Sequence, residues 1–176
     1  MQVREKSGQT LTEPITYAQM KVYMGSDEIV EAVFNAIIKP ARIWLEKYTG
    51  CSVISKIYEV EFERDDGYEN WYELPFYPVT SITTVQIDST DVDYYEKGQT
   101  IVEIYPQSAI STGTSDNTLD VEFIAGASNT LAVEALYRMV SDLYNTRTTG
   151  GGDVSTVSFQ WDTMSLINQL SKNTNI

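Results

Sequence analysis

The stretch EIVEAVFNAIIKPARIWLEKYTGCSVISKIYEVEFE, residues 28–63, decides the fold, because its hydrophobic period changes partway along. In its first half, apolar residues recur every three or four positions, as on one face of an amphipathic helix. Thr49-Gly50 is a typical helix end, with the glycine as a left-handed cap. From Ser52 onward the period changes to two, and apolar and charged residues alternate over 58–63, as in a half-buried strand. The stretch predicts a helix over 26–49, with Ser26 and Asp27 as its N-cap signal, followed by β structure.

Pro40 lies inside the predicted helix 26–49. A proline removes one backbone hydrogen bond and clashes with the preceding turn, so we expect the helix to kink or to split near Lys39. Upstream, Thr16 and Gln19 form a capping-box pattern that starts a short helix over 16–24. The residues before it, 1–14, are predicted to form a flexible N-terminal arm.

Between residues 52 and 126 the alternating pattern returns several times, separated by turn signals, which predicts an inserted antiparallel β module. The run after the first turn, 70–74, is expected to be a partner of the strand over 58–63. A third helix is expected over 128–146, and its apolar face must pack on the earlier helices. The predicted class is α+β: a helical bundle (short helix, long kinked helix, C-terminal helix) with an inserted β module and an extended C-terminal arm.

The chain is strongly acidic, with 25 Asp and Glu against 12 Lys and Arg and a formal net charge of −13. Residues 51–126 hold 15 of the acidic and three of the basic residues, so the β module carries almost all of the excess. Such a charge opposes non-specific binding to a phosphate backbone, which depends on Lys and Arg. No stretch approaches the roughly 20 apolar residues of a membrane span, so no membrane partner is expected.

Enzymatic function is disfavoured by the absence of histidine and the presence of a single cysteine, Cys51. Ser–His and Cys–His nucleophile pairs are excluded, and so are zinc sites built on His or on several thiolates. Carboxylate chemistry with a hard metal remains, with Glu59, Glu61 and Glu63 on one strand face as its candidates. The alternative is that these glutamates form the solvated face of an edge strand. Asp88, Asp91 and Asp93 form a second acidic cluster, and we expect them to belong to a turn. We therefore predict no catalytic residue, cofactor or metal.

Two apolar clusters are candidates for protein contacts. Trp71, Tyr72, Phe76 and Tyr77 surround two prolines in the β module, where they form either core and turn structure or an interface, in which Tyr and Trp are enriched. The tail after Gly150-Gly151-Gly152 is too apolar for a solvated segment. It either folds back on its own domain or docks on a partner. Its candidate docking residues are Val157, Phe159, Trp161, Met164, Ile167 and Leu170.

The order of these parts resembles the head–tail connector (head-completion or adaptor) proteins of tailed bacteriophages. The resemblance rests on a set of ordered motifs over residues 15–147. They are ITYAQMKVYMG, then SDEIVEAVFNAIIKPARIWLEKYTG, YEVEF, ELPFYPVTSITTVQ, LDVEFIAG and EALYRMVSDLYNTR. The most specific are Glu-x-x-Thr-Gly at the end of the long helix, Leu-Pro-x-x-Pro-Val-x-Ser-Ile in the β module, and Leu-Tyr-x-x-Arg closing the last helix.

The resemblance implies a structural virion protein, made in the host cytoplasm, that forms a ring of about 12 subunits under the portal. Residues 15–147 would then be the connector domain, and 148–176 a hinge and arm that docks on the portal protein. A tail or neck protein would bind the other side, and double-stranded DNA would pass through without sequence-specific binding. The alternatives are a non-viral protein-binding adaptor and a hard-metal-dependent carboxylate enzyme.

Overall fold

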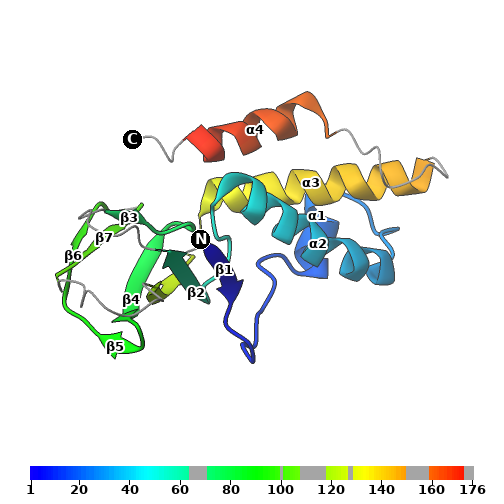
Figure 1. The fold of residues 1–176 in the computed structure, drawn as a ribbon. Coiled ribbons are helices and arrows are strands. Elements are labelled where there is room, and N and C mark those ends of the chain that lie inside the picture. Colours follow the sequence, from blue (N-terminus) through cyan, green and yellow to red (C-terminus); the bar gives the residue numbers. More distant parts are fainter. Residues whose placement is uncertain (64–70, 100, 108–117, 127–128, 150–158, 173–176) are drawn as a thin grey trace. The chain divides into compact units, whose positions relative to one another are not determined.

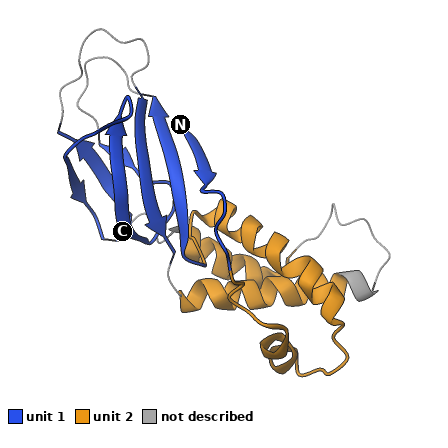
Figure 2. Cartoon of the chain, turned by 90° about the horizontal axis from the view of Figure 1, so that it is seen from below, with its two compact units in different colours: residues 1–11, 54–127 blue, residues 12–53, 128–176 orange. Residues whose placement is uncertain are grey.

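The computed structural model describes residues 1–63, 71–99, 101–107, 118–126, 129–149 and 159–172 (Figure 1). The chain divides into two compact units, shown in different colours in Figure 2. A β unit consists of residues 1–11 and 54–127, and a helical unit consists of residues 12–53 and 128–176. The predicted α+β class is confirmed, with antiparallel sheets in one unit and helices in the other.

The β unit contains two antiparallel sheets. The five-stranded sheet has the order β1-β2-β8-β4-β5, and the three-stranded sheet has the order β3-β7-β6. The strands are β1 (Gln2–Glu5), β2 (Lys56–Glu63), β3 (Tyr72–Glu73), β4 (Val79–Ile87), β5 (Thr90–Asp91), β6 (Tyr94–Lys97), β7 (Glu103–Pro106) and β8 (Thr118–Ala125). The run over 70–74 was expected to pair with β2, and this is wrong: β3 pairs with β7, while β2 lies between β1 and β8.

One face of the large sheet supplies most of the core of the β unit, and Leu74, Val102 and Ile104 complete it. Tyr58 lies opposite Phe123 and Val60 lies opposite Val121, and all four are buried. Because side chains alternate along a strand, the residues between them form a polar face on the other side of the sheet. The alternation read from the sequence over 58–63 and 119–124 is therefore the division between core and surface.

The prediction of a flexible arm over residues 1–14 is wrong for its first part. Gln2–Glu5 form edge strand β1, in which Arg4 pairs with Glu59 of β2, and Val3 packs on the core. The side chain of Gln9 extends this pairing: its amide donates to the carbonyl of Ile57 (2.9 Å) and its oxygen accepts from the Ile57 N–H (2.7 Å). Four residues are too few for a recognisable period, so the strand is formed by its partner rather than by its own pattern.

In the described residues the helical unit consists of α1 (Tyr17–Met24), α2 (Glu31–Thr49), α3 (Thr130–Thr149) and α4 (Trp161–Lys172). None of these helices is long and apolar enough to cross a membrane. Helix α1 begins with the predicted capping box of Thr16 and Gln19. Helix α2 ends at the predicted left-handed Gly50, with φ of 72°. Helices α2, α3 and α4 contact one another in pairs.

Helix α2 begins later than the predicted residue 26, because side chains form hydrogen bonds with the backbone groups that a longer helix would use. The Tyr17 hydroxyl donates to the Ile29 carbonyl (2.6 Å), and the Val30 N–H donates to the Tyr144 hydroxyl (3.0 Å). The hydroxyl of Ser26 accepts from the Glu28 N–H, which makes a local turn instead of a helix cap.

Pro40 does not split α2, which runs unbroken from Glu31 to Thr49. The carbonyl of Ala36 lacks its usual i+4 donor because proline has no N–H. Both Ala36 and Pro40 are exposed, so water can supply the missing hydrogen bond. The solvent-facing position of the proline therefore makes the interruption tolerable.

Candidate interaction surfaces

The C-terminal segment folds back on its own unit. Residues Thr163, Ile167 and Leu170 of α4 are all buried, and α4 packs on both α3 and α2. Of the two roles left open for the tail, folding back is the one observed over residues 159–171, and the expected extended arm is wrong there. Ile167 and Leu170 are core residues and not free docking residues. Val157 lies outside the described residues.

The N-terminus of α4 is fixed to α3 by Asp142. One carboxylate oxygen of Asp142 accepts hydrogen bonds from the Gln160 N–H (3.1 Å) and from the Thr163 hydroxyl (2.8 Å). A carboxylate at this end of a helix satisfies a free N–H and interacts favourably with the helix dipole. Asp142 therefore acts as a cap supplied by a neighbouring helix.

An aromatic cluster joins α2 to the start of α4. The ring of Trp44 stacks on Tyr48 (centroids 5.0 Å apart, planes at 8°) and meets Phe159 at 5.2 Å. Trp44 and Tyr48 are 40% and 48% exposed, and Trp161 is 84% exposed. Met164 is half-buried and lines a shallow hollow with Trp161. Trp161 and Met164 thus remain available to a partner, together with the Trp44 cluster.

The aromatic residues predicted as a possible interface in the β unit divide into core and surface. Phe76 stacks on Tyr58 (4.4 Å), Tyr72 packs on Phe62 (5.1 Å), and Tyr77 is buried. Only Trp71 of the four is exposed. The Lys97 ammonium lies 4.3 Å from the centroid of its ring, a cation–π contact. The core role therefore applies to three of these residues and the surface role to Trp71.

The polar face of the large sheet gathers acidic residues from β2 and β8. In the register Glu59 lies opposite Glu122, and Glu61 lies opposite Asp120. Arg4 of β1 pairs with Glu59 (2.6 Å), and Lys6 pairs with Glu122. The four acidic residues and Arg4 line a hollow of about 420 Å³ with parts of β1 and β4. Burial and then the charge of Glu61 raise the pKa of Asp120 above its ordinary value.

The geometry gives no support to a metal-dependent carboxylate enzyme. Within the described residues, no group of three or more Cys, Asp and Glu side chains is arranged to hold a metal ion. Glu63 is exposed at the end of β2, whereas Glu59 is engaged with Arg4. Asp88 and Ser89, both with positive φ, form the two-residue turn between β4 and β5, which agrees with the turn role expected for this acidic loop.

A buried ion-pair cluster in the helical unit was not predicted. Arg42 of α2 is 1% exposed and binds Glu13 through two nitrogens (2.7 and 3.0 Å) and Glu46 through a third (2.8 Å). Burial opposes the charge, but Glu13 and Glu46 outweigh it and raise the pKa of Arg42. The signal was present in the sequence, because Arg42 and Glu46 are four residues apart on the same arc as buried Ile38 and Leu45. The cluster holds residues before α1 against α2.

Comparison with known proteins gives matches among solved structures only. No family model matches the chain, and no curated protein sequence matches it significantly. The fold is similar to that of a chain in the virion of a native gene transfer agent particle, with a TM-score of 0.71 and 14% identity over 97% of this chain and 95% of the other.

Two further matches come from necks of gene transfer agent particles. The neck of the empty particle, computed with C6 symmetry, contains a chain with a TM-score of 0.67 and 15% identity, covering 97% of this chain and 95% of that one. The neck of the native particle, computed with C12 symmetry, contains a chain with a TM-score of 0.66 and 15% identity, covering 97% of this chain and 94% of that one. At these identities the likeness is one of fold. It agrees with the class of neck protein that the ordered sequence motifs resemble.

Proposed function

We propose that this chain is a non-enzymatic structural subunit of a virion neck, a head–tail connector that joins the capsid portal to the tail. The observation that carries the proposal is the likeness in fold, over 97% of the chain, to chains in three structures of gene transfer agent particles, two of which are structures of the neck. The sequence motifs resemble the same class independently of that comparison. A virion location, with synthesis in the host cytoplasm, follows from this role.

The proposed assembly is a closed ring of about 12 subunits that frames the DNA channel. The C12 symmetry with which the neck of the native gene transfer agent particle was computed supports this number. A net charge of −13 per subunit suits a ring through which duplex DNA slides without binding, because the phosphates are repelled. Double-stranded DNA is therefore a passing partner in this proposal, without sequence-specific contacts.

The ring binds the portal protein on one side and a tail or neck protein on the other. For the portal contact we retain the exposed residues at the start of α4: Trp161, with Phe159 and Met164 beside it. Large aromatic side chains that are exposed on a fixed helix make effective anchors, since little further ordering is needed on binding. The exposed Trp71 of the β unit is a candidate for the second contact.

The test is cryo-electron microscopy of the portal co-expressed with this protein. The expected result is a ring of density at the portal, into which the two units fit. The variant Trp161→Ala should reduce ring occupancy about tenfold or more, as loss of an anchor residue does, while Asn35→Ala, exposed on α2 and outside the hollow that Trp161 lines, should leave it unchanged. A portal that carries none of the wild-type protein would contradict the connector role and favour a free protein-binding adaptor.

A further inference from the structure

Nearly all described cationic side chains are engaged within their own unit. In the β unit the ion pairs are Arg4–Glu59, Lys6–Glu122, Lys56–Glu5 and Lys97–Glu103. In the helical unit they are Lys21–Asp27, Arg42 with Glu13 and Glu46, and Arg138 with Glu134 and Asp162. Among the Lys and Arg side chains that the structure describes, only Lys39 and Lys47 have no ion-pair partner. Both belong to α2.

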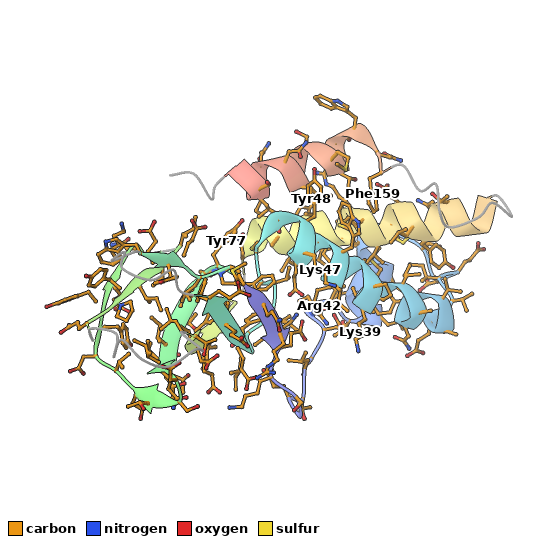
Figure 3. All side chains as sticks on the ribbon, in the orientation of Figure 1. Lys39, Arg42, Lys47, Tyr48, Tyr77 and Phe159 are labelled. Atoms are coloured by element: carbon orange, nitrogen blue, oxygen red, sulfur yellow. The ribbon has the colours of Figure 1, made fainter. Side chains whose placement is uncertain are left out.

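Lys39 and Lys47 share the exposed side of α2 with Trp44 and Tyr48. Successive helix residues are 100° apart, so these four positions fall within one half of the helix circumference. The other half carries the buried residues Phe34, Ile38, Ala41, Arg42, Leu45, Glu46 and Thr49. Figure 3 shows Lys39 and Lys47 along α2, and Tyr48 beside Phe159. We call the four exposed residues the α2 stripe.

The α2 stripe has the charge opposite to that of the β unit. Residues 1–11 and 54–127 contain 16 Asp and Glu and five Lys and Arg, a net charge of −11. The helical unit has nine acidic and seven basic residues, a net charge of −2. The four cations of the β unit whose side chains the structure describes each pair with a carboxylate of that unit, and the unit as a whole keeps its large acidic excess. The natural counterpart of this excess is a cation from another molecule.

On the basis of the ring assembly proposed above, we infer that the α2 stripe binds the acidic β unit of a second copy of this chain. A closed ring joins subunits head to tail, so one surface must fit a different surface of the next subunit. Two copies of the stripe facing each other would oppose like charges, whereas the stripe against a unit of net charge −11 gains attraction. The charges of the two lysines determine which surface of the next subunit they meet and how the two subunits are aligned.

The aromatic pair supplies the apolar part of the interface. Trp44 and Tyr48 are already stacked on each other, and Phe159 supports Trp44 from α4. About half of each ring is open to solvent, so a partner can cover the pair with little loss of side-chain freedom. Trp and Tyr are among the residues enriched at binding hot spots.

The inference is tested by comparing ring formation on the portal for two variants with the same change in net charge. Lys39→Gln with Lys47→Gln removes both cations of the stripe. Ala18→Glu with Thr130→Glu is the control, because both sites are exposed in first helical turns, where an anion is tolerated. We expect the first variant to assemble about tenfold more weakly and the control to match the wild type. Circular dichroism verifies that each variant is folded.

Carbodiimide cross-linking of mixed ¹⁵N-labelled and unlabelled wild-type protein identifies the acceptor. Mixed-isotope peptides should join Lys39 or Lys47 to Asp or Glu of residues 54–127. If both variants form rings equally well, the inference is overturned while the connector role stands. Intact rings that lose bound DNA on removal of the lysines also overturn it, in favour of a phosphate contact. Failure of the wild-type protein to form any ring overturns the proposed function as well.

Discussion

Replacing Asp142 by alanine should weaken the attachment of α4 to α3 without unfolding the rest of the helical unit. The carboxylate of Asp142 accepts two hydrogen bonds from the start of α4, at 3.1 Å from the Gln160 nitrogen and 2.8 Å from the Thr163 hydroxyl oxygen. Loss of a capping side chain costs about 0.5–2 kcal/mol, and loss of an anion at a helix N-terminus about 0.3–1 kcal/mol. These contributions overlap, and together they give about 1–2 kcal/mol.

Amide hydrogen exchange measures this loss directly, because it reports local opening helix by helix. A cost of 1–2 kcal/mol corresponds to an increase of about 5- to 30-fold in the population of the open state. The exchange of amides in α4 should accelerate by that factor in Asp142→Ala, while those of α2 stay as in the wild type. Asp142→Asn retains an acceptor oxygen without the charge and should show a smaller acceleration.

Thr163→Val provides the matched partner variant, since valine keeps the shape of the buried threonine and removes only its hydroxyl. In a double-mutant cycle the effects of Asp142→Ala and Thr163→Val should be less than additive, because both delete the same hydrogen bond. Unchanged exchange in α4 would refute the assignment of Asp142 as its cap. An equal acceleration across all four helices would show instead that Asp142 stabilises the unit as a whole.

Two further predictions concern charge inside each unit. Arg42→Met should lower the free energy of unfolding by about 3–5 kcal/mol in chemical denaturation, because it leaves Glu46 buried without Arg42. The double variant Arg42→Met with Glu46→Met should recover much of the lost stability. A loss no larger than that caused by Arg4→Met, at an exposed ion pair, would contradict the prediction. Asp120→Asn should raise the free energy of unfolding by about 0.2–1 kcal/mol at a pH of about 7, since it removes a like charge opposite Glu61. The raised pKa of Asp120 means that protonation favours the folded state, so this gain should fade as the pH falls through that pKa and vanish below its ordinary value of 3.8. Asp93→Asn, on an exposed loop, is the control and should leave the free energy of unfolding unchanged at a pH of about 7.

The parts of the fold that the sequence predicted are those with strong local signals. The capping box of Thr16 and Gln19, the glycine at the end of α2 and the alternation of β2 and β8 depend on neighbouring residues alone. The pairing of β2 with β8 joins segments about 60 residues apart, and no local pattern specifies that register. The edge strand β1 and the late start of α2 escaped prediction for the same reason, since distant groups determine both.

The structure of the tail could not be predicted from its sequence, because the sequence fits both folding back on the helical unit and docking on a partner. Thr163, Ile167 and Leu170 recur at steps of four and three, which is the spacing of a helix with one buried face. That spacing favours folding back, but the same apolar residues could equally occupy a groove on a partner. The contact that decides between them includes Asp142, a single half-buried carboxylate on another predicted helix. Its role becomes visible only when α3 and α4 are seen together.

The folded tail changes what a truncation experiment can reveal. Removal of α4 would expose the apolar surfaces of α2 and α3 that Ile167 and Leu170 cover, and it would also remove Phe159 from Trp44. Such a protein could lose portal binding, ring contacts and stability together, so its failure would not identify a docking residue. Point substitutions at Trp161 and at the two lysines of the α2 stripe separate these effects, because each alters an exposed side chain and leaves the helix packing in place. The tail is thus both a part of the fold and the support of an aromatic surface to which α2 contributes.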